Sequence, residues 1–135
     1  MTRVGLLIAA LLLAGAPIRA AEPPAEPDLA DLIGSRPLVV FADTPDDPKF
    51  VQQMQWLEAQ PGDLAERRVV VLTDTDPAAS GPLRLRLRPR GFGLVLIDVD
   101  GQIAHRRPLP TTVREITNLI DRTPSRRQET GSFRP

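Results

Sequence analysis

Arginine is the residue type best placed to do chemistry in this sequence, because the chain has no cysteine and only one histidine. Guanidinium groups bind carboxylate or phosphate through paired hydrogen bonds. Six arginines lie close together in the second half of the chain and are predicted to form an interaction surface for anions: Arg84, Arg86, Arg88, Arg90, Arg106 and Arg107. The alternative is a solvated face whose charges pair with the acidic first half.

Carboxylates form a second candidate site. Five aspartates follow two apolar runs of the sequence: Asp43, Asp46, Asp47, Asp74 and Asp76. Carboxylate oxygens at such spacing could hold a hard cation such as calcium, or carry out acid–base work in the Asp43-Pro48 loop. The alternative is turn chemistry, because aspartate directly before proline is typical of a helix start.

The remaining polar and aromatic candidates favour structural roles. His105 has no cysteine or obvious carboxylate partner nearby, which favours an exposed strand residue over a base or ligand. Trp56 lies off the apolar stripe of its predicted helix, which favours edge packing over a recognition hot spot. No phosphate loop, nucleophile elbow or zinc-protease motif is present, so we assign no catalytic residue, cofactor or metal ligand.

The first 20 residues have the three parts of a secretory signal peptide. Arg3 gives a positive start, residues 4–16 are apolar or small, and Ala20 and Ala21 provide small residues for cleavage. The apolar run is too short to cross a bilayer, although an uncleaved anchor is the alternative. We therefore predict a periplasmic or secreted bacterial protein with no stable membrane insertion after cleavage.

The charge balance gives no reason to expect a nucleic-acid partner. Arg3 and Arg19 lie in the first 20 residues, so the rest of the chain has 15 basic and 17 acidic residues and a net charge of −2. Residues 21–81 carry 4 basic and 12 acidic residues, and residues 82–135 carry 11 and 5. The predicted partner is an unknown protein of the cell envelope.

Four segments are predicted to be strands: residues 37–42, 69–72, 92–99 and 102–106. The first two are continuous apolar runs, which are typical of strands covered on both faces. Asp100 and Gly101 form a hairpin-turn signal between the last two. We expect the third strand to return parallel beside the first.

Helices are predicted between and after the strands. Residues 28–33 form a short helix capped by Asp28, and Asp47 begins a helix with Phe50, Val51, Met54 and Leu57 on one face. Residues 83–88 fit a strand or a short helix, and the need for a crossover favours the helix. Thr112 and Glu115 form a capping box for a last helix, with Val113, Ile116, Leu119 and Ile120 on its apolar side.

The chain is predicted to consist of four segments: a signal peptide (1–20), a proline-rich leader with a short helix (21–35), one α/β domain (36–124) and a polar, arginine-rich tail (125–135). The element order resembles the thioredoxin superfamily over residues 38–121. Residues 39–42 are similar to the strand before a thioredoxin active-site loop, and residues 94–103 to the central hairpin. The resemblance implies a thioredoxin-like three-layer sandwich, with a central four-stranded mixed sheet flanked by helices.

More narrowly, the chain resembles a secreted bacterial family known as domain of unknown function 4174. The ending Ile120-Asp121-Arg122-Thr123-Pro124-Ser125-Arg126-Arg127-Gln128-Glu129 is the most specific part of this resemblance. Residues 43–48 stand where thioredoxins have Cys-x-x-Cys, and Gly91-Phe92-Gly93 stands where they have a cis-proline. Without a thiol the chain cannot carry out disulfide exchange alone. We expect a non-catalytic interaction or ligand-binding module, with a carboxylate- or metal-dependent enzyme as the alternative.

Overall fold

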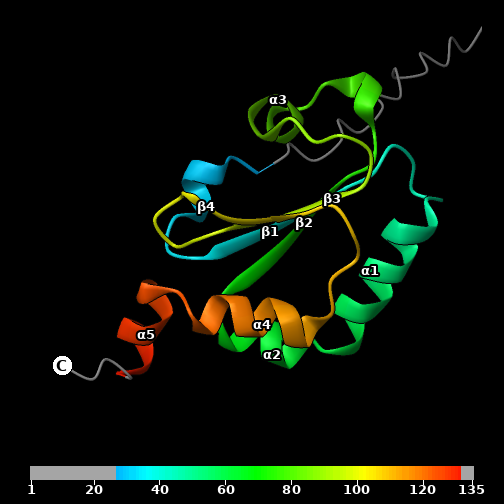
Figure 1. The fold of residues 1–135 in the computed structure, drawn as a ribbon. Coiled ribbons are helices and arrows are strands. Elements are labelled where there is room, and N and C mark those ends of the chain that lie inside the picture. The colour runs from blue at the N-terminus through cyan, green and yellow to red at the C-terminus, as the bar shows by residue number, and fades with distance from the viewer. Residues whose placement is uncertain (1–26, 132–135) are drawn as a thin grey trace, which may run out of the picture.

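Four strands form one mixed sheet in the computed structural model, which describes residues 27–131 (Figure 1). The strands are β1 (Arg36–Phe41), β2 (Val69–Asp74), β3 (Gly93–Ile97) and β4 (Ile103–Arg107), in the order β2-β1-β3-β4. β1 pairs parallel with β2 and antiparallel with β3, and β3 pairs antiparallel with β4. The predicted signal peptide and residues 21–26 of the predicted leader lie outside the described residues.

β1 is the central strand and is buried on both faces. Leu38, Val40 and Ala42 have no exposed surface, and neither do Val39 and Phe41 between them. Such a strand needs apolar side chains at every position rather than at alternate ones. This confirms the prediction made for residues 37–42. The same prediction for residues 69–72 is wrong, because β2 is an edge strand whose residues remain partly exposed.

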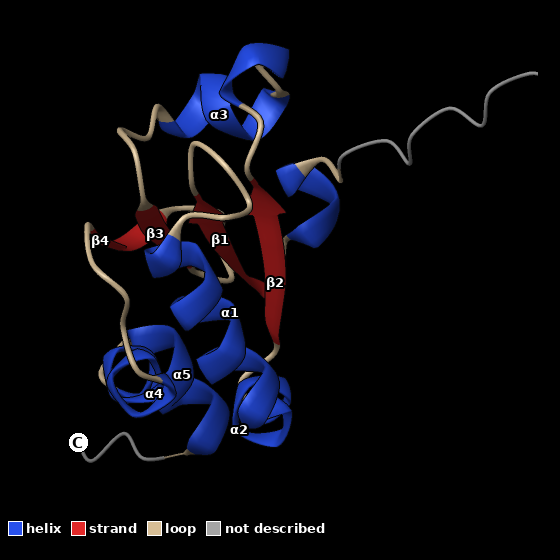
Figure 2. Cartoon of the chain, turned by 90° about the vertical axis from the view of Figure 1, so that its right-hand side faces the viewer, coloured by secondary structure: helices blue, strands red, loops and turns tan. Residues whose placement is uncertain are grey.

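Helices cover both faces of the sheet, so the predicted three layers are confirmed. Figures 1 and 2 show α3 on one side of the sheet and α1, α2, α4 and α5 on the other. Leu38 and Val40 point into the core on the four-helix side, and Val39 and Phe41 point into the core beneath α3. The alternation follows from the two-residue period of a strand.

The first helix α1 (Pro48–Ala59) begins as predicted, because Asp47 Oδ1 accepts the Lys49 N–H at 2.9 Å. The predicted apolar face is wrong at Val51, which is 41% exposed. Gln53 is fully buried instead, because its amide bonds both backbone groups of Thr111 (Nε2–O 2.9 Å and N–Oε1 2.8 Å). A buried amide is tolerated where its partners are provided.

Pro61 begins a helix that was not predicted. α2 (Pro61–Glu66) has this proline in its first turn, where a missing N–H costs nothing. Leu64 of α2 packs into the core on the four-helix side. A short 3₁₀ helix η1 (Leu29–Leu32) replaces the predicted helix at residues 28–33 and has the predicted cap, Asp28.

The prediction that β3 runs parallel to β1 is wrong. The chain leaves β2 at Asp74 and begins β3 at Gly93, and both residues pair with Phe41 at the end of β1. Between them lie η2 (Pro77–Ala79) and α3 (Pro82–Leu87), which confirms the helix favoured for residues 83–88. In this arrangement the connection starts and ends at the same end of the sheet, so β3 enters beside the end of β1 and runs antiparallel to it.

Two helices end the described part of the chain, and the second begins at Pro124. α4 (Val113–Asp121) is capped by Thr112, whose Oγ1 accepts the Glu115 N–H as the capping-box prediction requires. α5 (Pro124–Thr130) then follows within the segment that sequence analysis assigned to a polar tail. No residue of α5 is buried, and the helix is held on the domain by the ion pairs described below. Among residues 27–131, no helix is long and apolar enough to span a membrane.

Candidate functional site

Four of the six predicted arginines surround one groove. Arg88, Arg90, Arg106 and Arg107 line a hollow of about 230 Å³ together with Pro89, Phe92, Gly93, Leu94, Val95 and Pro108. None of these lining residues is acidic. The groove lies where β3 begins and β4 ends, at the same end of the sheet as the loop that follows β1.

Three of these guanidinium groups are available to a ligand. Arg88, Arg90 and Arg107 are exposed and make no side-chain hydrogen bond or ion pair with residues 27–131. Arg106 differs, because its Nη1 donates to the carbonyl of Leu87 at 2.7 Å. It therefore ties β4 to the end of α3. Arg88 is the left-handed C-cap residue of α3, with φ 48°.

The Arg84 side chain is largely buried and bonds to other residues of the domain, so it is not part of an exposed anion-binding surface. Its Nη2 donates to Asp74 Oδ1 at 3.1 Å and to the carbonyl of Ala42 at 3.0 Å. Its guanidinium also lies 5.5 Å from the ring centre of Phe41. The two side chains of the Arg84–Asp74 pair are 12% and 7% exposed. This pair joins α3 to the carboxyl ends of β1 and β2.

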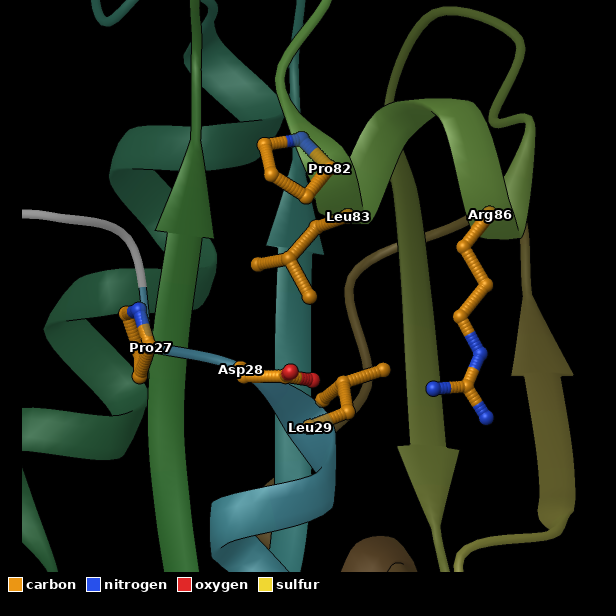
Figure 3. A pocket seen from close by; sticks show the side chains of 6 residues that line it. All are labelled: Pro27, Asp28, Leu29, Pro82, Leu83 and Arg86. Atoms are coloured by element: carbon orange, nitrogen blue, oxygen red, sulfur yellow. The ribbon is translucent and has the colours of Figure 1, made fainter.

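Arg86 lies apart from the groove, beside a separate pocket of about 190 Å³ between η1 and α3. Figure 3 shows Leu83 reaching from α3 toward Leu29 and Asp28, with Arg86 extending from the other end of the helix. Asp28 is engaged as the cap of η1. The pocket is therefore mainly apolar and brings no set of reactive groups together.

The predicted carboxylate site is not assembled. Asp47 is engaged as the cap of α1, and Asp74 is engaged by Arg84. Asp43 and Asp46 are exposed and Asp76 follows β2 in a turn, where its N–H donates to Asp74 Oδ1. Within the described part of the chain, no three acidic or histidine side chains form a group that could hold a metal ion.

His105 and Trp56 lie among packing residues. His105 is partly buried and lines a small cavity with Leu38, Leu94, Leu96, Arg107, Ile116 and Leu119. This cavity belongs to the core under the helices rather than to the groove floor. Trp56 is partly exposed on α1. Neither side chain contacts a second reactive group in residues 27–131.

Sequence analysis missed a buried arginine at the other end of the sheet. Arg36, the first residue of β1, is 1% exposed and donates to Asp98 Oδ1 (Nε, 3.2 Å) and to the carbonyl of Arg67 (Nη1, 2.9 Å). It also donates to both carboxylate oxygens of Glu129, at 3.2 and 3.0 Å, and to Ser125 Oγ. A cation at the start of a fully apolar strand was the signal that could have identified it.

The network around Arg36 fastens α5 to the sheet. Ser125 Oγ donates toward both oxygens of Asp98 (2.8 and 2.9 Å), and Arg126 contributes a further ion pair to Glu129 (3.1 Å). Burial raises the pKa of Glu129, but hydrogen bonds from Arg36 and Arg126 outweigh it and hold that pKa below its ordinary value. Arg126 Nε is buried without a hydrogen-bond partner, but the guanidinium of Arg36 and the carboxylates of Asp98 and Glu129 are bonded to one another or to Ser125, which favours a structural clasp over a reactive site.

A second ion pair links α2 to α4 beside this clasp. Arg67 donates to both carboxylate oxygens of Asp121 (Nε–Oδ1 2.9 Å and Nη2–Oδ2 3.1 Å). The hydrogen bond from Arg67 lowers the pKa of Asp121 against the opposing effect of burial. The same bond raises the pKa of Arg67.

One family model matches this chain. It is described as "Domain of unknown function (DUF4174)" and covers residues 32–129. The matched segment includes Arg36 and ends at Glu129, so it contains both ends of the clasp. Among the curated proteins none matches the chain.

Solved structures similar to the chain include peroxiredoxins. A reduced 2-Cys peroxiredoxin of Plasmodium vivax is 15% identical, with a TM-score of 0.59 and coverage of 78% of this chain and 85% of that one. An N-terminally modified Prx1a of Plasmodium yoelii is 19% identical, with a TM-score of 0.56 and coverage of 79% and 83%. At such identities the similarity shows the fold alone. The thioredoxin-like fold class is thereby confirmed.

Proposed function

The chain belongs to the DUF4174 family, and from this premise we propose that it is an interaction module that binds acidic segments of a partner protein. The observation that carries the proposal is the groove lined by Arg88, Arg90, Arg106 and Arg107. We place the module outside the cytoplasm, in the bacterial cell envelope, because residues 1–20 have the pattern of a secretory signal peptide.

The chemistry of the groove supports an anionic ligand. Three exposed guanidinium groups have no side-chain partner among residues 27–131, and each can bind a carboxylate through two parallel hydrogen bonds. A compact site with like charges and no acid among its lining residues repels cations and attracts anions. An acidic peptide segment matches this surface better than a neutral one.

Absence of cysteine supports a binding role over thiol chemistry. The peroxiredoxin neighbours share the fold, but this sequence offers no thiolate to attack a peroxide or a disulfide. The alternative enzyme would use carboxylates of residues 43–48 or Asp74. Asp47 and Asp74 are engaged as a helix cap and an ion pair, which disfavours this alternative.

Binding of a fluorescent hexaglutamate peptide tests the proposal by anisotropy. We expect saturable binding that weakens as the salt concentration rises, because exposed charges are screened. The double substitution Arg90→Glu and Arg107→Glu reverses two charges of the groove and is expected to abolish binding of the peptide. The fold should be retained, because neither side chain bonds to another residue of the described part of the chain.

The matched control is Arg114→Glu with Arg122→Glu, which changes the net charge equally on an exposed part of α4 away from the groove. This control is expected to bind nearly as well as the original chain. Equal loss of binding in the two double variants would show a general charge effect and overturn the groove as the site.

A further inference from the structure

The two edges of the sheet differ in how well they are protected against pairing with another strand. At one edge, β4 carries Arg106 and Arg107, has a register irregularity opposite Leu96 and Ile97, and is followed by Pro108. Charges, bulges and proline are the usual devices that protect an edge strand. β4 therefore discourages strand addition.

Residues 69–73 of the other edge strand, β2, have none of these devices, and its one charged residue, Asp74, ends the strand and is paired with Arg84. Val69, Val70, Val71 and Leu72 are apolar and partly exposed, Thr73 is exposed, and four of these five residues are β-branched. Its pairing with β1 is regular over all six positions. A regular, uncharged and apolar edge is a template for another strand.

Two hydrogen bonds identify which backbone groups of β2 point outward. The carbonyls of Arg68 and Asp74 both accept from the β1 side, at 2.8 and 3.0 Å from the N–H groups of Arg36 and Ala42. Backbone groups alternate in direction along a strand, so even-numbered residues face β1. The N–H and C=O groups of Val69, Val71 and Thr73 therefore face the open edge.

The outward N–H and C=O groups of β2 can form hydrogen bonds with the same groups of a second copy of the chain. In an antiparallel pair centred on Val71, Val71 meets its own copy and Val69 meets Thr73 of the other chain. All three outward residues then form hydrogen-bonded pairs, with about six backbone hydrogen bonds in total. Shifting the centre to residue 70 or 72 leaves fewer outward residues facing each other.

The charges at the ends of β2 agree with this register. Arg67 and Arg68 precede the strand, and Asp74 and Asp76 end and follow it. Antiparallel pairing centred on Val71 brings the end that carries the exposed Arg68 of one copy beside the end that carries the exposed Asp76 of the other, while Asp74 stays paired with Arg84. Opposite charges across strands are favourable. Parallel pairing would instead place like charges side by side.

We propose that two copies of this chain pair antiparallel through β2, about a twofold axis at Val71, to form one continuous eight-stranded sheet. The partner is a second copy because the outward backbone groups and the end charges are both self-complementary. The arginine groove lies at the β4 edge, so each dimer presents two grooves at its two ends. A partner with two acidic segments would gain avidity from such an arrangement.

Sedimentation velocity of the purified protein over a range of concentrations tests the pairing. We expect the molar mass to double with rising concentration. Val71→Pro removes the central outward N–H without removing a bond to β1, and it is expected to keep the chain monomeric. The control Val71→Thr keeps both the N–H and the β-branched shape, and it is expected to dimerise.

Cysteine crosslinking tests the register independently, with no background because the sequence has no cysteine. In the proposed pair, Cα atoms of Val71 and its copy lie about 5.5 Å apart, within the range that a disulfide bridges. Thr73 and its copy are separated by four residue steps along the strands, about 13 Å or more. Val71→Cys is therefore expected to form a disulfide-linked dimer under mild oxidation, and Thr73→Cys is not.

A chain that remains monomeric at every concentration would overturn the proposal, and so would crosslinking of Thr73→Cys in preference to Val71→Cys. Neither result bears on the arginine groove, because peptide binding at β4 does not require the β2 edge. Conversely, loss of peptide binding leaves the dimer proposal intact.

Discussion

Arg36 at the start of β1 and Glu129 near the end of α5 are joined by two hydrogen bonds, Nη1–Oε2 at 3.2 Å and Nη2–Oε1 at 3.0 Å. The pair connects residues 93 positions apart in the sequence. A planar guanidinium matches a carboxylate in this two-bond geometry. The buried Arg36 side chain is therefore a main attachment of the C-terminal helix, beside the Ser125–Asp98 hydrogen bonds and the Arg126–Glu66 ion pair.

Replacing Arg36 is expected to be strongly destabilising. Arg36→Met leaves Asp98 without its cation and Glu129 with Arg126 alone. Losing one partner of a buried ion pair costs about 3–5 kcal/mol. Urea unfolding followed by circular dichroism measures the loss. Arg122→Met at an exposed position is the control and should change the free energy of unfolding by less than about 0.5 kcal/mol. Equal midpoints for the two variants would contradict the assigned role.

Stability is expected to fall in acid because of the same clasp. The pKa of Glu129 lies below its ordinary value of 4.5, and the pKa of Asp121 below 3.8. A carboxyl with a lowered folded-state pKa stabilises the fold above its unfolded-state pKa, and the contribution is lost as pH falls through the folded-state value. The free energy of unfolding should therefore decline below about pH 4.5.

The double variant Glu129→Gln and Asp121→Asn isolates this pH effect. Neither amide titrates, so the decline in unfolding free energy between pH 5 and 3 should be shallower than in the original chain. Denaturant melts at several pH values provide the comparison. An unchanged slope would assign acid sensitivity to other carboxyl groups.

Arg84 and Arg86 are expected to respond differently to the same substitution. Arg84→Ala leaves Asp74 buried without its cation and removes a donor from the carbonyl of Ala42, so we expect a loss of about 3 kcal/mol. Arg86→Ala removes an exposed side chain and should change stability by less than about 0.5 kcal/mol. Thermal and urea unfolding of the two variants make the test. Similar losses would contradict the internal position of Arg84.

Gln53 is expected to be essential for the connection between β4 and α4. Gln53→Leu removes both partners of the Thr111 backbone, and each orphaned buried group costs about 1–3 kcal/mol. The matched control is Gln52→Leu, at an exposed position of the same helix. Hydrogen exchange at the Thr111 amide should accelerate in the first variant and not in the second.

The sequence alone determined the kinds of elements and most of their places. Continuous apolar runs identified β1 and β2 as strands, although only β1 is fully buried, and Asp47 and Thr112 identified two helix starts. Both signals depend on neighbours within a few residues. Absence of cysteine excluded thiol chemistry without any structure. The direction of β3 was predicted wrongly, because it depends on which end of the sheet the segment between β2 and β3 reaches in space.

The tertiary structure decided which charged residues act together. Six arginines look equivalent in the sequence, but Arg88, Arg90 and Arg107 line a groove, Arg84 and Arg106 bond to other parts of the domain, and Arg86 lies beside a separate pocket. Arg36 and Glu129 are separated by almost the whole domain, so no local pattern pairs them. Charge–charge contacts depend on distance in space, and only the packed sheet and helices fix that distance.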